Sequence, residues 1–172
     1  MFTTLVVVAI IILILGLMYN SLTSKKNHVE DIFGLVNTQL KKRYDLIPNL
    51  ISSVSEYMQQ EKTLLESVTS IRSKAIKHNL EDTEVISLDK KMVSALSSLM
   101  IAFDTYPEIK ANENLLKIQA SLNQIEEQIQ AARETYNQAV TKYNLAIDII
   151  PINYMAKIMS YKKKVLFNID KT

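Results

Sequence analysis

The chain has 172 residues, enough for one domain with a hydrophobic core in addition to an apolar terminal segment. It contains no cysteine and two glycines, Gly16 and Gly34, which excludes disulfides, thiolate metal sites and glycine-rich nucleotide-binding loops. Its 20 Lys+Arg residues nearly balance 18 Asp+Glu residues, and the net charge of +2 predicts no nucleic-acid partner.

An apolar, uncharged stretch covers residues 2–19. As a helix it would measure about 27 Å, close to the ~30 Å hydrocarbon core of a bilayer. No basic residue precedes it, and it ends in Leu17, Met18 and Tyr19, where a signal peptide would carry small residues at a cleavage site. A buried core helix would show a polar face, which this stretch lacks. We therefore predict that residues 1–22 form an uncleaved single-pass transmembrane helix in contact with membrane lipid.

The basic residues nearest the anchor indicate its orientation. Lys25 and Lys26 follow it directly, and a second basic group lies at residues 41–43, whereas the N-terminal flank has no basic side chain. The positive-inside rule then places the C-terminal part in the cytoplasm and the N-terminus outside. The expected location of the anchor is a bacterial inner membrane.

Apolar side chains after the anchor recur at alternating steps of four and three residues, the period of helices packed nearly parallel, as in a coiled coil. One face of a first helix carries Val29, Ile32, Phe33, Val36 and Leu40. A second carries Leu50, Val54, Tyr57, Leu64, Val68, Ile71 and Ala75, with Glu61 as its charged member. A third carries Val85, Leu88, Met92, Ala95, Leu99, Ala102 and Tyr106. A fourth carries Leu115, Ile118, Leu122, Ile125, Ile129, Ala132, Tyr136, Ala139, Tyr143 and Ala146.

Prolines and a polar stretch mark the ends of these helices. Pro48 suits the start of the second helix, and residues 78–83 are typical of a loop. Pro107 opens the fourth helix and Pro151 ends it, because proline cannot continue a helix interior. The predicted fold is all-α, an up-down four-helix bundle with helices near 22–46, 49–77, 83–106 and 108–148, behind the transmembrane helix.

The predicted domains are the anchor (1–22), the bundle (23–150) and a basic, partly apolar C-terminal tail (151–172).

The fourth helix would span roughly 60 Å, against about 36 Å for the first helix beyond the membrane. A strictly collinear anchor and first helix would drive the polar end of the fourth helix into lipid. We expect a bend near residues 21–27, a tilted bundle or a break in the fourth helix.

Polar residues form a stripe beside the apolar seam of the fourth helix. They are Asn112, Gln119, Glu126 and Arg133 at intervals of seven, continued by Asn137 and Asn144. Earlier helices offer partners at Gln39, Arg43, Asn49, Glu61 and Arg72. The stripe is either a solvated flank or a partly buried hydrogen-bond network that sets helix register. We favour the network, because Glu61 interrupts its seam and needs a cationic partner if enclosed.

Several stretches of the chain carry a family resemblance: YNSL (19–22), QLKKRYDLIPNL (39–50), YMQQEKTLLESV (57–68), YPEIKANENLLKIQASL (106–122) and EEQIQAARETYNQAVTKYN (126–144). Together they resemble the LemA family over nearly the whole chain. The matching motif positions are Gln39, Arg43, Pro48, Asn49, Leu50, Glu61, Asn112, Gln119, Glu126, Arg133, Tyr136, Asn137 and Asn144. The resemblance implies a single-pass membrane protein with a four-helix bundle and brings no catalytic assignment. After Asn144 the chain departs from the family, which usually continues with Phe-Pro and a short tail containing glycine and phenylalanine.

The sequence offers no convincing catalytic, cofactor or metal site. His28 and His78 are fifty residues apart and have no ligand-like companion at helical spacing. Pairs of glutamates, Glu61 with Glu66 and Glu126 with Glu127, fit salt bridges of a bundle better than acid–base catalysis.

The C-terminal tail combines Lys162, Lys163 and Lys164 with aromatic and aliphatic neighbours. An even number of antiparallel helices returns the chain towards the anchor, so these lysines join Lys25 and Lys26 near the membrane. The tail either docks on anionic lipid or is a mobile, solvated terminus.

We predict a non-enzymatic membrane protein that binds or organises protein partners of unknown identity. Self-association is expected, with Met58, Leu65 and Ile76 beside the seam as the surface for a partner helix. Lipid binding or membrane remodelling through the basic tail is the second hypothesis. An enzyme, or an adaptor for a membrane protease, is the third.

Overall fold

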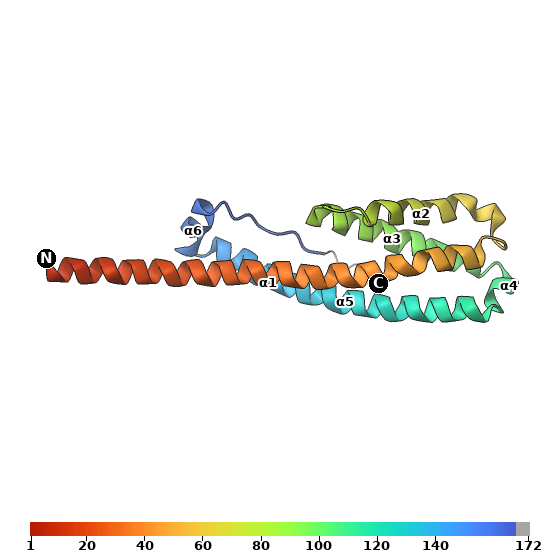
Figure 1. Ribbon diagram of the computed structural model, residues 1–172, viewed down its shortest axis with the longest axis horizontal. Helices are drawn as coiled ribbons and strands as arrows, with labels where there is room; N and C mark the ends of the chain where they lie inside the picture. Colours follow the sequence, from red (N-terminus) through yellow and green to blue (C-terminus); the bar gives the residue numbers. More distant parts are fainter. Residues whose placement is uncertain (168–172) are drawn as a thin grey trace. The chain divides into compact units, whose positions relative to one another are not determined.

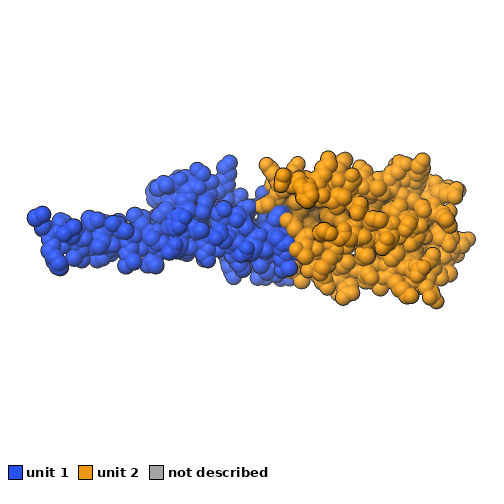
Figure 2. Space-filling view, viewed as in Figure 1, with its two compact units in different colours: residues 1–35, 133–172 blue, residues 36–132 orange. Residues whose placement is uncertain are grey.

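The computed structural model describes residues 1–167, and every secondary-structure element in that range is helical. The elements are α1 (Phe2–Val54), the short 3-10 helix η1 (Gln59–Glu61), α2 (Lys62–Ala75), α3 (Asp82–Phe103), α4 (Pro107–Lys110), α5 (Glu113–Asp148) and α6 (Ile152–Ile158). They form two compact units (Figure 2). Unit 1 combines residues 1–35 with the chain from Arg133 onward, and unit 2 comprises residues 36–132.

The N-terminal apolar stretch and the first bundle helix belong to one continuous helix, α1, of 53 residues (Figure 1). Residues 21–27, where a bend was one of three expectations, are helical throughout. The apolar side chains of α1 from Phe2 to Leu17 are exposed, with 81% of the surface of Phe2 and 63% of that of Leu13 accessible. Within residues 1–167, α1 is the one helix whose length and composition suffice to cross a membrane.

α1 runs through Pro48 to Val54, so the predicted start of a second helix at Pro48 is wrong. Proline has no N–H to donate to the carbonyl four residues earlier, which belongs to Tyr44. The Nε of Arg72, on α2, donates to the Tyr44 carbonyl oxygen at 2.8 Å. The carbonyl of Tyr44, to which Pro48 cannot donate, therefore has a donor from another helix, and α1 continues for six residues beyond the proline.

After α1, the chain of unit 2 turns and folds back as η1, α2 and α3. Figure 1 shows α2 and α3 lying side by side. The loop between them, predicted at 78–83, occupies residues 76–81 and contains Asn79 with a positive φ of 64°. Asparagine is one of the few residue types that adopt this conformation at low cost. The first turn of α3 is closed by Glu84, whose carboxylate accepts the N–H of Glu81 at 3.0 Å.

The core of unit 2 follows the predicted seams. Its buried apolar side chains include Val36, Leu40, Leu50, Val54, Val68, Met92, Leu99, Leu115, Leu122 and Ile129. Met58 and Leu65, expected to face a partner helix, are buried as well, with 0% and 8% of their surface exposed. That part of the self-association hypothesis is wrong, because these side chains fill the core of their own unit. Ile76 remains 47% exposed.

Pro107 opens α4, as predicted, but the fourth helix is interrupted at residues 111–112, just after this single turn. The side-chain Oδ1 of Asn112 accepts the N–H groups of Asn114 at 3.0 Å and Leu115 at 3.2 Å. These contacts satisfy two of the first N–H groups of α5, so Asn112 acts as a helix cap. The interruption was one of the three ways in which the length mismatch could be relieved.

Unit 1 contains the apolar part of α1, the C-terminal part of α5, α6 and an extended segment at 161–167. Its core joins α1 to the extended segment at 161–167 through the rings of Phe33, Tyr136 and Phe167. The ring centroids of Phe33 and Tyr136 are 5.4 Å apart, and those of Tyr136 and Phe167 are 5.3 Å apart in an edge-on arrangement. Such aromatic pairs stabilise the folded state by more than the burial of their apolar area alone.

The contact between Arg72 and Tyr44 yields a test. Replacing Arg72→Met keeps most of the packing volume but removes the donor, and we expect it to destabilise the protein by about 1–3 kcal/mol. In a Pro48→Ala background the alanine N–H can bind the Tyr44 carbonyl, so the same substitution should have a much smaller effect. Denaturant unfolding of the four proteins in detergent measures this coupling. Equal effects of Arg72→Met in both backgrounds would contradict the assigned role.

Candidate functional site

A buried ionic cluster lies within unit 2, around Arg43 of α1. The Arg43 side chain is 1% exposed, and its two terminal nitrogens bind different helices. One donates to Asp89 Oδ1 of α3 at 2.5 Å, and the other donates to Glu126 Oε2 of α5 at 3.0 Å. Three helices therefore meet at a single guanidinium group.

Electrostatics favour the charged form of this arginine. Burial alone would lower the pKa of the Arg43 guanidinium, but the negative charges of Asp89 and Glu126 outweigh it, so the pKa is raised. Asp89 is buried, whereas the Glu126 side chain is 31% exposed. Solvent at Glu126 thus reduces the cost of enclosing two carboxylates with one cation.

Sequence reasoning found Arg43 and Glu126 but missed Asp89. A signal was present, because Asp89 directly follows the seam residue Leu88, in the same way that Glu126 follows Ile125. The polar stripe of α5 therefore has a counterpart of one residue on α3.

The other proposed network residues of unit 2 lie elsewhere. Gln39 is half-buried on α1, one turn before Arg43, and Gln119 lines a surface hollow with Phe103 and Leu116. Asn49 is exposed, and Glu61 is half-buried in η1. Arg72 binds the Tyr44 carbonyl and Asn112 caps α5, as described above.

A second polar group lies in unit 1, where α5 binds the extended C-terminal segment through the side chains of Asn137 and Asn144. Asn144 accepts the N–H of Lys164 and donates to its carbonyl oxygen, both at 2.9 Å. Asn137 makes the same pair of bonds to Phe167, both at 2.8 Å. Each amide therefore satisfies both backbone groups of one residue, as a neighbouring β-strand would.

Two tyrosines reinforce this contact. The hydroxyl of Tyr136 donates to the Val165 carbonyl, and that of Tyr143 donates to the Lys162 carbonyl, each at 3.1 Å. Burial, together with nearby Tyr161 and Glu30, raises the pKa of Tyr143, so its phenol keeps the proton that it donates.

The spacing of these side chains explains why a helix can hold an extended chain. Seven residues of a helix advance about 10.5 Å, and three residues of an extended chain advance about 10 Å. The Tyr-Asn pairs at 136–137 and 143–144 are seven residues apart, and Lys164 and Phe167 are three apart. Arg133, one turn earlier on α5, places its guanidinium 5.8 Å from the centre of the Phe167 ring.

Two of the five basic residues assigned to the membrane surface, Lys26 and Lys163, form ion pairs. Lys26 binds Glu30 at 2.9 Å and lies over the ring of Tyr161 at 5.4 Å. The hydrogen bond to Glu30 raises the pKa of Lys26, against the lowering effect of its slight burial, and Glu30 and Tyr161 add to the rise. Lys163 pairs with Asp148 at 2.7 Å. The remaining three are Lys25, half-buried, Lys162, exposed, and Lys164, half-buried.

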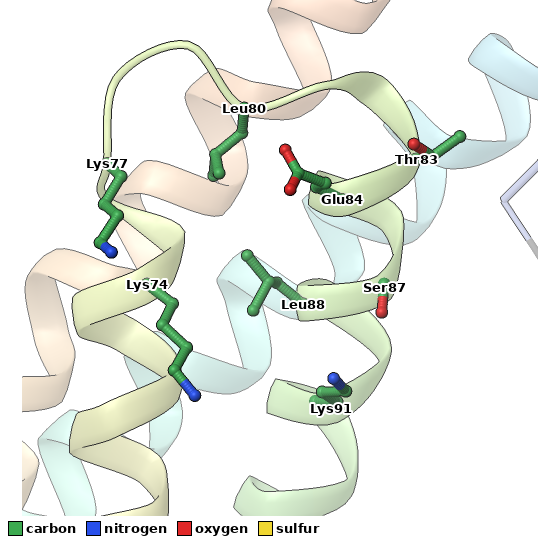
Figure 3. Close-up of a pocket in the computed structure, with 8 residues that line it drawn as sticks. All are labelled: Lys74, Lys77, Leu80, Thr83, Glu84, Ser87, Leu88 and Lys91. Atoms are coloured by element: carbon green, nitrogen blue, oxygen red, sulfur yellow. The ribbon is translucent and has the colours of Figure 1, made fainter.

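Surface hollows offer little for catalysis. The one in Figure 3, of about 430 Å³, lies between α2 and α3, and its lining includes Lys74, Lys77 and Lys91 together with Leu80 and Leu88. Its lining has the hydroxyl groups of Thr83 and Ser87 but no histidine. No group of three potential metal ligands exists within the described part of the chain.

These features define an all-helical, membrane-associated protein whose buried polar side chains join helices and chain segments. The sequence profile of the LemA family matches residues 33–172, and the chain belongs to this family. The match begins after the apolar stretch of α1 and confirms the resemblance seen in the motifs.

Individual relatives carry names from two groups. Protein LemA of Metamycoplasma hominis is 25% identical over 153 residues, which cover 85% of this chain and 70% of the relative. Magnetosome protein MamQ 2 of Paramagnetospirillum magneticum is 32% identical over 83 residues, 48% of this chain and 30% of that protein. MamQ of Magnetospirillum gryphiswaldense is 29% identical over 84 residues, 49% of this chain and 31% of that protein. None of these names describes an enzyme.

The ionic cluster yields a second test. Replacing Arg43→Met leaves the buried Asp89 carboxylate without its cation, and we expect a loss of about 3–5 kcal/mol in unfolding free energy. Adding Asp89→Leu should recover part of this loss, because it removes the uncompensated charge. Lys41→Met is the matched control, since the Lys41 side chain is 74% exposed and should change stability by less than about 1 kcal/mol. Equal midpoints for Arg43→Met and Lys41→Met in denaturant unfolding would contradict the structural role.

Proposed function

We propose that this protein is a non-enzymatic, membrane-anchored helical protein that organises protein partners at the cytoplasmic face of the membrane. The proposal rests on one observation, the contacts that the polar side chains make inside the two units. Those brought together inside the units, such as Arg43, Asp89 and Asn144, bind other side chains or the backbone. They are engaged in holding the fold, which leaves the outer surfaces of the helices for function.

We infer that unit 2 acts as an up-down four-helix bundle. Arg43 connects α1, α3 and α5, and Arg72 connects α2 to α1. Ties between all four long helical segments suit a protein that presents a constant surface. The cytoplasmic location rests on Lys25 and Lys26, which follow the apolar stretch.

The surface of unit 2 best suited to a partner is a hollow of about 350 Å³ between α3, α4 and α5. Phe103, Ile109 and Leu116 supply its apolar lining, and Gln119 and Asn123 supply amide groups. Leu116 is 49% exposed. An apolar hollow with a polar edge is typical of a protein interaction site.

Photocrosslinking in intact membranes tests this assignment. A photoreactive residue at Asn123, which is exposed and lines the hollow, should form a discrete adduct with a second protein. Adding Leu116→Lys should abolish the adduct, because a charge then occupies the apolar lining. The same photoreactive residue at exposed Ser97 is the control and should form none. An adduct from Asn123 that is unaffected by Leu116→Lys would argue against the hollow.

A second candidate function, lipid binding, is favoured by the place of α6 in unit 1. An apolar hollow of about 300 Å³ is lined by Ile11, Ile14, Leu15 and Met18 of α1 together with Pro151, Tyr154, Met155 and Ile158 at α6. Tyr154 is 61% exposed and Ile158 is 82% exposed. α6 thus lies beside the segment that would cross the membrane, and it exposes the apolar side chain of Ile158 and the ring of Tyr154 together with Lys157. We propose that α6 inserts into the cytoplasmic leaflet, with Lys162, Lys163 and Lys164 at the headgroups.

Tryptophan fluorescence can measure this insertion, because the chain contains no tryptophan. A single reporter at Tyr154→Trp, in proteoliposomes with brominated acyl chains, should be quenched almost as strongly as one at Leu15→Trp in the anchor. A reporter at Tyr57→Trp, on the surface of unit 2 and 41% exposed, is the unquenched control. Quenching at residue 154 no greater than at residue 57 would exclude insertion of α6.

A further inference from the structure

The face of α5 in unit 1 has the features of a binding site for an extended peptide. Six hydrogen bonds reach the segment 162–167 from Tyr136, Asn137, Tyr143 and Asn144, and all of them go to its backbone N–H and carbonyl groups. Recognition is therefore largely independent of the side chains that the segment carries. This is the principle by which sheet edges bind added strands.

Two side chains of the segment add contacts, the exposed ion pair of Lys163 with Asp148 and the buried ring of Phe167. Phe167 is 3% exposed and lies against Tyr136 and Phe33, whereas Val165 and Leu166 are 51% and 43% exposed. The site thus selects an aromatic residue three positions after the residue bound by Asn144. Neither family membership nor the role proposed for unit 2 assigns a ligand to this face.

We propose that this α5 face is an exchangeable strand-binding site, and that its second occupant is the segment 162–167 of another copy of the same chain. Every copy carries both the site and a segment with the correct register. A segment donated in trans makes the same six hydrogen bonds and places the same ring against Tyr136. Exchange of an identical element between protomers is a route to self-association that requires no new surface.

The connection to α6 is suited to such an exchange. Only residues 159–161 separate α6 from the bound segment, and Ser160 has a positive φ of 54°. A serine in this region is strained, and release of the segment allows it to become extended. Anchoring in one membrane raises the effective concentration of neighbouring segments, which favours exchange between copies.

Complementation between two defective full-length chains tests the proposal. The site-defective chain carries Asn137→Ala and Asn144→Ala and keeps a normal segment. The segment-defective chain carries Lys164→Pro and Phe167→Pro, which removes the two N–H donors and the ring but leaves the site intact. Each chain alone should be unable to exchange, whereas a mixture should associate through the intact site of one and the intact segment of the other. A site-defective chain that also carries Leu166→Pro keeps both N–H donors and is the matched control, which should still associate.

Energy transfer in proteoliposomes reads out the association. A single cysteine replaces exposed Gln130 in each chain for dye attachment, since the natural chain has none. We expect transfer in the mixture at least fivefold above that of either chain alone at the same density in the membrane. Transfer in the mixture no higher than in either chain alone overturns the proposal.

A synthetic peptide of residues 161–167 with an amidated end tests the binding site independently of the identity of its natural occupant. Binding of this peptide to the segment-defective chain without association of the two chains would still overturn the proposal, because the occupant would then be a segment of another protein. Either result leaves the hollow of unit 2 untouched, so failure here is distinguishable from failure of the proposed partner role.

Discussion

The buried charge of Arg43 is the constraint on which unit 2 depends. A guanidinium that is 1% exposed must have carboxylates within hydrogen-bond distance, because an unpaired buried charge costs several kcal/mol. Asp89 and Glu126 come from helices far apart in sequence, so only one axial position of α3 and α5 relative to α1 satisfies the cation. Apolar seams tolerate sliding by a heptad, whereas this contact does not. The ionic cluster thus specifies register, and the apolar side chains around it supply most of the stability.

The polar stripe of α5 meets two different needs. In unit 2 it supplies a carboxylate, Glu126, to the buried cation. In unit 1 it supplies amides, Asn137 and Asn144, which both donate and accept and can therefore satisfy a peptide group completely. A carboxylate could not donate to the Lys164 carbonyl, and a lysine could not accept the N–H. The residue type at each step follows from what lies opposite.

Much of the fold could be predicted from local patterns, and the misses have a common cause. Seam residues such as Met92 and Ile129 are buried as their period predicts. The helix end expected at Pro48 fails because a local rule is overridden by a tertiary contact, the donor from Arg72. Asp89 was missed because a carboxylate on a helix is normally solvated, and only the position of Arg43 in space makes it a partner. The path of residues 162–167 was unpredictable for a related reason: its backbone is what α5 binds, and backbone carries no sequence signal.

The same reasoning bears on where function resides. Arg43, Asp89 and Asn144 hold helix register and the extended segment, so the role proposed above rests on the outer surfaces of the helices. Two of those surfaces are unlike ordinary solvated helix faces. α6 exposes Tyr154 and Ile158 beside the apolar stretch of α1. Contact with lipid is more favourable than contact with water for such apolar side chains. The strand site of α5 is filled by a short segment held mainly through its backbone, and such an occupant can be replaced without redesigning the site. A membrane anchor brings copies of both surfaces into one plane, which is the condition under which weak, repeated contacts become assemblies.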